Sequence, residues 1–223
     1  MLVVHHLNNS RSQRVLWLLE ELGLAYEIKR YERDARTMLA PPQLRAIHPL
    51  GKAPIVTDNG RTLAESGAIL EYLVNVYGSG RLIPSAGSDA RLRYTYWMHY
   101  AEGSLMPVLL LRLVFSRISH APTPAVLRPL TRAIERGVRG RFIDPQLELH
   151  LNFLEAELGR SDWFAGPEFT AADIQMSFPL EAAQKRGVLG SPHPRLRQWL
   201  HTIRARSAYQ RAIERGGPYS LLE

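Results

Sequence analysis

Residues 48–73 read HPLGKAPIVTDNGRTLAESGAILEYL, and this stretch says most about the fold. Ile55–Asp58 and Thr62–Ala64 are short β-prone runs, and Asn59-Gly60 between them is a strong signal for a tight hairpin turn. After Ser66, which we expect to cap a helix, apolar residues recur at helical spacing. The stretch therefore predicts a hairpin followed by a helix.

The residues before this stretch add two strands and a helix. Leu2–His5 predicts a strand, and Tyr26–Arg30 predicts a second one. Between them, apolar residues at helical spacing run from Val15 to Leu22, and Gly23 stands where a helix would end. Because a helix joins the two strands, they should be parallel. Residues 36–47 predict a weaker helix, disturbed by two prolines.

The chain changes character near residue 80. Residues 81–89 are rich in Pro, Gly and Ser, and nothing after Asp89 predicts a strand. Thr170-Ala171-Ala172-Asp173 is a capping box that opens one of several helices. We therefore expect an α/β N-terminal domain of order βαβαββα over residues 1–79, a linker over 80–89 and an all-α domain over 90–223.

Composition excludes several kinds of chemistry. The 223 residues contain no cysteine, which excludes disulfides, cysteine-ligated metals and a thiol nucleophile of the protein's own. The eight histidines do not fall at a metal-binding spacing, so we expect no metal site. No apolar run approaches the roughly 20 residues that span a bilayer, and the N-terminus does not resemble a secretion signal. We expect a cytoplasmic protein without a membrane span.

The net charge of +7 rests on 25 arginines and only 3 lysines. Arg128, Arg132, Arg136 and Arg139 would share one helix face, which we interpret as solvated. An alternative is binding of an anionic surface, but no nucleic-acid recognition motif accompanies these arginines. We therefore expect no nucleic-acid partner.

Two segments could together bind a peptide. Pro54 precedes a strand, and a cis Ala53–Pro54 bond would turn the backbone of Ala53 outward to pair with a ligand. Glu65 and Ser66 stand at a helix start, where free N–H groups and the helix dipole favour a carboxylate. This combination suits an extended peptide that carries a carboxylate and an ammonium group.

Three motifs, in this order, carry a resemblance that spans nearly the whole chain. SRSQRVLWLLEELGL (residues 10–24), the stretch 48–73 and FTAADI (residues 169–174) resemble the soluble glutathione transferases of the serine, theta-like type. The resemblance implies a thioredoxin-like first domain, an all-helical second domain, a homodimer, and glutathione as co-substrate.

The resemblance also implies roles for single residues. Ser10 matches the hydroxyl that hydrogen-bonds the glutathione sulfur, although the adjacent Asn8 and Asn9 leave an asparagine-assisted variant open. Ala53, before Pro54, matches the residue whose backbone pairs with the cysteinyl part. Glu65 and Ser66 match the pair that holds the γ-glutamyl end. Lys52 is a candidate for the glycyl carboxylate.

The implied activity is conjugation of glutathione to hydrophobic electrophiles, through a thiolate that Ser10 would stabilise. Tyr100 and Met106 are candidates for the electrophile pocket, although the aromatic run around Tyr100 also fits a core or dimer contact. Two alternatives stay open. One is glutathione-dependent reduction of peroxides or disulfides at the same site, and the other is a non-catalytic binding protein with this fold.

Overall fold

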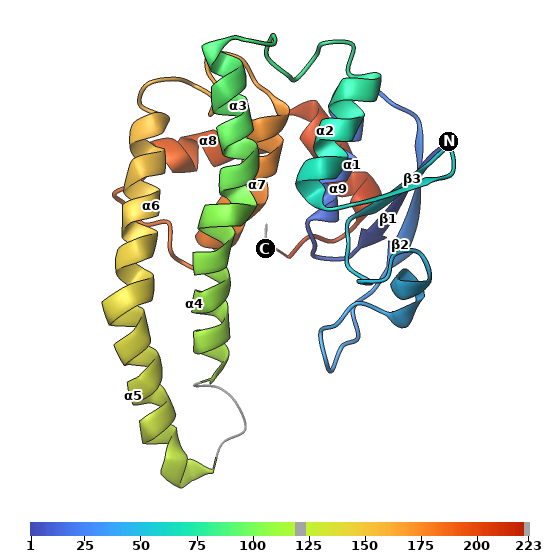
Figure 1. Cartoon of the computed structure of the whole chain (residues 1–223). Helices are drawn as coiled ribbons and strands as arrows, with labels where there is room; N and C mark the ends of the chain where they lie inside the picture. The colour runs from blue at the N-terminus through green and yellow to red at the C-terminus, as the bar shows by residue number, and fades with distance from the viewer. Residues whose placement is uncertain (119–123, 221–223) are drawn as a thin grey trace.

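Four strands form one mixed sheet in the N-terminal part of the computed structural model, which describes residues 1–118 and 124–220 (Figure 1). Across the sheet the order is β2 (Tyr26–Tyr31), β1 (Leu2–Leu7), β3 (Ile55–Asp58) and β4 (Arg61–Ala64). β1 and β2 are parallel, whereas β1–β3 and β3–β4 are antiparallel. All six residues of β1 are buried, as befits a central strand covered on both faces. The predicted strands and their directions are confirmed.

Helices α1 (Ser12–Leu22) and α2 (Ser66–Tyr77) pack with this sheet. Gly23 ends α1 with a left-handed φ of 68°, as predicted. The expectation that Ser66 caps α2 is wrong by one residue: Ser66 is the first helical residue and Glu65 holds the cap position, with φ of 71°. The helix predicted over residues 36–47 is also wrong. Only the 3₁₀ turn η1 (Pro42–Ala46) forms there, because the prolines interrupt the helix.

The helical part contains two long rods that stand side by side (Figure 1). One consists of α3 (Asp89–Tyr100), a π-helical turn η2 (Ala101–Leu105) and α4 (Met106–Ile118). The other consists of a short 3₁₀ turn η3 (Ala125–Leu127), α5 (Arg128–Val138), a second π-turn η4 (Arg139–Ile143) and α6 (Asp144–Glu157). The lower part of both rods projects beyond the sheet, and α5 buries none of its residues.

Three further helices close the fold. α7 (Ala171–Lys185) is the most buried, and it begins at the predicted capping box of Thr170 and Asp173. α8 (Pro194–Arg204) follows, and α9 (Ser207–Gly216) returns to pack on α1. Glu20 of α1 joins α9 through ion pairs to Arg211 and Arg215, at 2.9 and 2.8 Å. The C-terminal end of the chain thereby reinforces the N-terminal sheet.

Two further predictions can be compared with the structure; the first holds, and the second, a solvated face of four arginines, holds at three of them. The Ala53–Pro54 peptide bond is cis. Arg128, Arg132 and Arg136 are exposed on α5, while Arg139 is half-buried and pairs with Glu135 and Asp144. None of the helices within the described ranges is long and apolar enough to cross a bilayer.

Candidate active site

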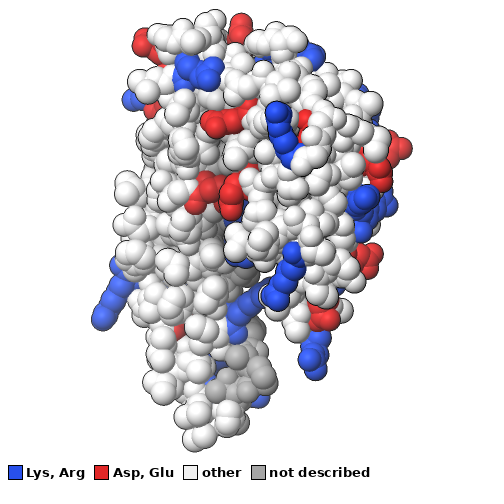
Figure 2. All heavy atoms as spheres, turned by 45° about the vertical axis from the view of Figure 1, so that its right-hand side comes forward, with Lys and Arg blue, Asp and Glu red and all other residues white. Residues whose placement is uncertain are grey.

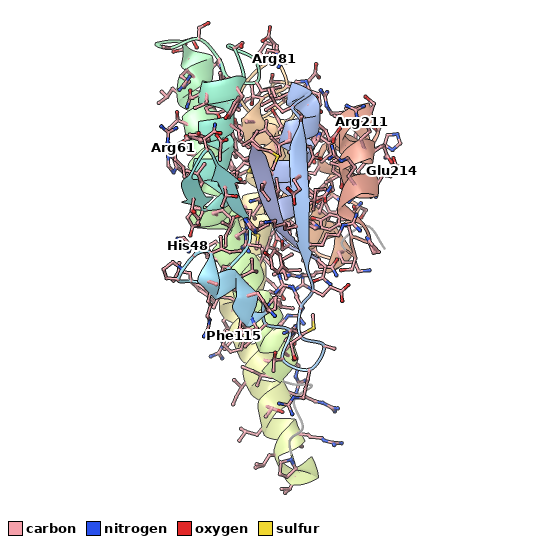
Figure 3. All side chains as sticks on the ribbon, turned by 90° about the vertical axis from the view of Figure 1, so that its right-hand side faces the viewer. His48, Arg61, Arg81, Phe115, Arg211 and Glu214 are labelled. Atoms are coloured by element: carbon pink, nitrogen blue, oxygen red, sulfur yellow. The ribbon has the colours of Figure 1, made fainter. Side chains whose placement is uncertain are left out.

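A cavity of about 230 Å³ opens where the loop before β3, the start of α2, the start of α1 and the π-turn η2 meet. In Figure 3 the labelled His48 of this cavity lies on the opposite side of the strands from α9, on which Arg211 and Glu214 are labelled. The residues that line the cavity are Arg11, His48, Leu50, Lys52, Ala53, Pro54, Ala64, Glu65, Ser66 and Glu102. All five predicted glutathione-binding residues are among them.

The loop wall of the cavity depends on Gly51. This residue has φ of 57°, and a Cβ built on it would stand 2.6 Å from Cγ of Arg45. Glycine alone fits this combination of left-handed backbone and close contact. The turn carries Lys52, whose side chain is exposed, and leads to Ala53 and Pro54 at the entry to β3. The loop therefore places a positive charge, on Lys52, and a short piece of backbone, at Ala53, at the wall of the same cavity.

The helix wall of the cavity begins at a strained residue. Glu65 has a left-handed φ of 71°, which is uncommon outside glycine, asparagine and aspartate. Its side chain is exposed and makes no capping hydrogen bond, so the carboxylate stays available to a ligand. Ser66 is buried at the start of α2, where first-turn N–H groups point outward. Strain of this kind is typical of binding sites.

Ser10 does not line this cavity. Its hydroxyl is 4 % exposed and lies 2.7 Å from Oγ of Ser12, which in turn lies 2.8 Å from Nδ1 of His6. The neighbouring asparagines make structural bonds as well. Oδ1 of Asn8 accepts from the backbone of Arg33, and Oδ1 of Asn9 accepts from the backbone of Ser220.

An ionic triad of Arg11, Glu102 and Arg14 joins the sheet-bearing part to the helical part at the cavity. Nε of Arg11 donates to both carboxylate oxygens of Glu102, at 2.9 and 3.0 Å, and Nη1 of Arg14 donates to Oε1 at 2.6 Å. Burial alone would raise the pKa of Glu102, but the charges of Arg14 and Arg11 outweigh it and hold the pKa below its ordinary value. The carboxylate is therefore ionised, and the triad carries a net charge of +1.

Tyr100 and Met106 lie in the core instead of the cavity. Their side chains are 7 % and 5 % exposed, and the hydroxyl of Tyr100 bonds Nδ1 of His150. A second hollow, lined in part by Glu65, Glu71, Glu102 and Gln175, adjoins the cavity and is acidic. In the parts of the chain that the structure describes, no three His, Asp or Glu side chains gather as metal ligands would.

Sequence reasoning missed five residues of the cavity, the apolar Leu50 and Ala64 and the polar Arg11, His48 and Glu102. Arg11 follows Ser10 directly, so its position at the helix start was a usable signal. His48 begins the loop that leads to Pro54. Glu102 lies 91 residues from Arg11, and no local pattern connects the two.

Family comparisons agree with this geometry. The sequence profile of the glutathione S-transferase N-terminal domain matches residues 1–75, and that of the C-terminal domain matches residues 133–202. Glutathione S-transferase 3 of Schizosaccharomyces pombe is 42 % identical over 96 % of this chain and 88 % of its own length. Glutathione S-transferase 1 of Saccharomyces cerevisiae is 32 % identical over 95 % of this chain and 94 % of its own.

Solved structures show the same architecture. A glutathione S-transferase from Actinobacillus pleuropneumoniae superposes with a TM-score of 0.82 at 32 % identity, covering 100 % of this chain and 96 % of that one. A sphingomonad glutathione S-transferase, solved in complex with glutathione, superposes with a TM-score of 0.74 at 22 % identity, covering 96 % and 98 %. The second likeness shows the fold alone. With two domain profiles and full-length relatives in agreement, this chain belongs to the glutathione S-transferase family of enzymes.

Proposed function

We propose that this protein binds glutathione in the 230 Å³ cavity and joins the sulfur of glutathione to a hydrophobic electrophile. The observation that carries the proposal is the convergence of Lys52, the Ala53 backbone, Glu65 and Ser66 on one cavity that also reaches the start of α1. Each group matches one part of the tripeptide. The β-hairpin and α2 fix the distances between them.

The tripeptide would lie along the loop and the start of α2. Its γ-glutamyl carboxylate faces Ser66 and the first N–H groups of α2, where the helix dipole favours negative charge. Its ammonium group faces Glu65 at the edge of the acidic hollow. The cysteinyl backbone pairs with Ala53, and the glycyl carboxylate lies near Lys52 and His48.

The sulfur then lies against the turn between β1 and α1. In the reaction the thiol loses its proton to water, and the thiolate attacks the electrophilic carbon. A sulfur–carbon bond forms while the leaving group departs with its electron pair. With an activated double bond, the π electrons instead move onto its activating group, and the adduct takes up a proton from water. The protein's task is to make the thiolate more abundant at neutral pH, because a free thiol with a pKa near 8.5 is mostly protonated.

The same proposal includes a homodimer. The hollow beside the cavity is lined by small residues, among them Gly67, Ala68 and Gly103, and by acidic side chains. It leaves an open surface there. A second copy of the chain would cover this surface. Sedimentation of the purified protein tests this part independently of activity.

Calorimetry with glutathione tests the binding site. We expect Glu65→Gln to weaken binding about 10-fold to 100-fold, because one charge-assisted hydrogen bond is worth roughly 1.5–3 kcal/mol. Glu214→Gln is the matched control, since Glu214 is exposed on α9, across the sheet from the cavity (Figure 3). Conjugation of an aryl halide by the wild type completes the test. Absence of glutathione uptake by the wild type would refute the proposal.

A further inference from the structure

The segment between β1 and α1 offers several polar side chains, but they do not face the same way. Ser10 and Ser12 are buried, and the carbonyl groups of Asn8 and Asn9 accept backbone hydrogen bonds. Arg11 lines the cavity and is about one third exposed. Of the side chains in residues 8–14, only that of Arg11 therefore borders the space where the peptide would lie.

The hydroxyl of Ser10 faces the protein interior. Oγ of Ser10 lies 2.7 Å from Oγ of Ser12, and either hydroxyl can donate in this contact. Oγ of Ser12 in turn lies 2.8 Å from Nδ1 of His6 and 3.3 Å from the carbonyl oxygen of Leu7.

Ser10 also accepts a hydrogen bond within the protein, from the backbone N–H of Ser12 to its Oγ at 3.2 Å. The residue is 4 % exposed and does not line the cavity. To reach a bound sulfur, the hydroxyl of Ser10 would have to turn away from these buried partners.

Arg11, in contrast, keeps donors available. Glu102 engages only its Nε, and within the described residues its two terminal nitrogens have no hydrogen-bond partner. Arg14 lies behind it, 1 % exposed, with Nε and Nη2 also unpartnered. One carboxylate therefore holds two guanidinium groups at the start of α1. Both guanidinium groups stand over the ring of Phe178, at 5.1 and 5.2 Å from its centroid.

The geometry points to Arg11, held in place by Glu102, as the side chain that stabilises the glutathione thiolate, with Ser10 serving as part of the internal support. This inference rests on the proposed glutathione site. Arg11 remains protonated throughout: the thiol proton leaves to water, and the thiolate gains a charge-assisted hydrogen bond and an ion pair. Glu102 is a positioning residue, because it acts only through the arginines.

The ultraviolet absorbance of the thiolate, titrated against pH in the complex with glutathione, tests the assignment. An opposite charge at about 4–6 Å lowers the pKa of an acid by roughly 1–3 units. We expect Arg11→Met to lose about that much of the pKa depression and Arg11→Lys to retain part of it. Ser10→Ala should shift the thiol pKa by much less than Arg11→Met.

Two further variants separate positioning and nonspecific effects. Glu102→Gln removes the carboxylate that orients Arg11 while adding to the local positive charge. A charge effect alone would lower the thiol pKa in that variant, whereas loss of positioning would raise it, and we expect a rise. Arg197→Gln, on the exposed face of α8, removes one positive charge far from the cavity and should leave the titration unchanged.

The outcomes distinguish this inference from the proposed function. If the wild type takes up glutathione and lowers its thiol pKa, but Ser10→Ala abolishes the effect and Arg11→Met does not, the assignment to Arg11 is overturned while the site stands. If the wild type takes up no glutathione, the site itself fails. Far-ultraviolet circular dichroism identifies a variant that does not fold, and Arg11→Lys against Ser10→Ala then decides the assignment.

Discussion

At the scale of single residues, the site depends on groups that burial keeps in one protonation state. Burial lowers the pKa of His6 to about 4, with a further contribution from the nearby charge of Arg30. At neutral pH the ring is therefore uncharged, and its Nδ1 lies 2.8 Å from Oγ of Ser12. The buried contacts from His6 through Ser12 to Ser10 behind the cavity thus involve an uncharged ring.

The same residue predicts an acid-sensitive stability. The unfolded chain takes up a proton at His6 as the pH falls below about 6.5, but the folded chain does so only near pH 4. The free energy of unfolding should therefore fall between these values, by up to about 3 kcal/mol. Urea unfolding of the wild type and of His6→Gln at several pH values checks this.

The comparison must be between the two proteins, because Asp173 titrates in the same range. Burial raises the pKa of Asp173 to about 6. The contribution of Asp173 to the free energy of unfolding therefore increases as the pH falls, opposite to that of His6. Asp173 is present in both the wild type and His6→Gln. The difference between the two profiles isolates His6. A difference that stays constant from pH 7 to 4 would contradict the assignment.

Gly51 supports a second prediction at this scale. Gly51→Ala combines a left-handed backbone with a Cβ 2.6 Å from Arg45, so the loop that carries Lys52 to Pro54 must move. We expect a stability loss of about 1–2 kcal/mol and a weaker affinity for glutathione. Gly60→Ala is a matched control, since Gly60 has φ of 82° but nothing within 4 Å of the added carbon. It should lose stability and keep its affinity, as measured by calorimetry.

At the scale of elements, α7 depends on its first turn. Asp173 accepts hydrogen bonds from the backbone of Phe164, and from the backbone and the hydroxyl of Thr170. Asp173→Ala leaves these buried donors without a partner and should lower the free energy of unfolding by about 3 kcal/mol or more. Ser88→Ala, which removes the cap of the more exposed α3, should cost about 1 kcal/mol. Equal losses in thermal unfolding would contradict this ranking.

The sequence predicted a turn or a helix end correctly where a few neighbouring residues determine it. The hairpin at Asn59-Gly60, the stop at Gly23 and the capping box at Thr170 each follow from the chemistry of a few adjacent side chains. The π-turn at Ala101–Leu105 has no comparable signal, because its wider hydrogen bonding depends on how the rod packs. Glu102 lies in that turn, so the sequence could not predict that its carboxylate would hold the two arginines.

The residues of the site were likewise predictable where they are close together in sequence, and not where their position depends on how helices pack. Lys52, Ala53, Pro54, Glu65 and Ser66 lie close together in sequence, and the structure brings all of them to one cavity. Tyr100 and Met106, which the sequence offers either to an electrophile pocket or to the core, lie in the core. Periodicity tells which side of a helix is apolar, but not whether that side meets another helix or a cavity.

At the scale of the whole molecule, positive charge gathers beside the cavity. Burial lowers the pKa of Arg186, and the like charges of Arg117, Arg112 and Arg11 lower it further. Among the described residues, none of Arg112, Arg117 and Arg186 has an ion-pair partner. Figure 2 shows Asp and Glu side chains in the upper part of the groove between the two halves and Lys and Arg side chains in its lower part.

This distribution predicts salt-dependent binding. Glutathione is a net anion at neutral pH, and the screening length falls from about 30 Å at 0.01 M salt to about 8 Å at 0.15 M. Its dissociation constant should rise over this range, and Arg186→Gln should flatten the rise while Arg197→Gln does not. The monoethyl ester of glutathione, a zwitterion with no net charge, should respond less. Calorimetry at four salt concentrations measures the slope, and identical slopes for both ligands would contradict the prediction.

The Arg11–Glu102–Arg14 triad has a consequence for how such a molecule can diversify. Its carboxylate stands on the rod that continues as α4, so a one-residue insertion between α3 and α4 would rotate Glu102 away from both arginines. Changes in the helical half that suit a new acceptor compound are therefore limited, because the same helices must keep Glu102 bonded to Arg11 and Arg14 beside the peptide-binding cavity. A change on the outward face of these helices leaves the bonds of Glu102 in place, whereas a change of their register would break its bonds to the arginines at the start of α1.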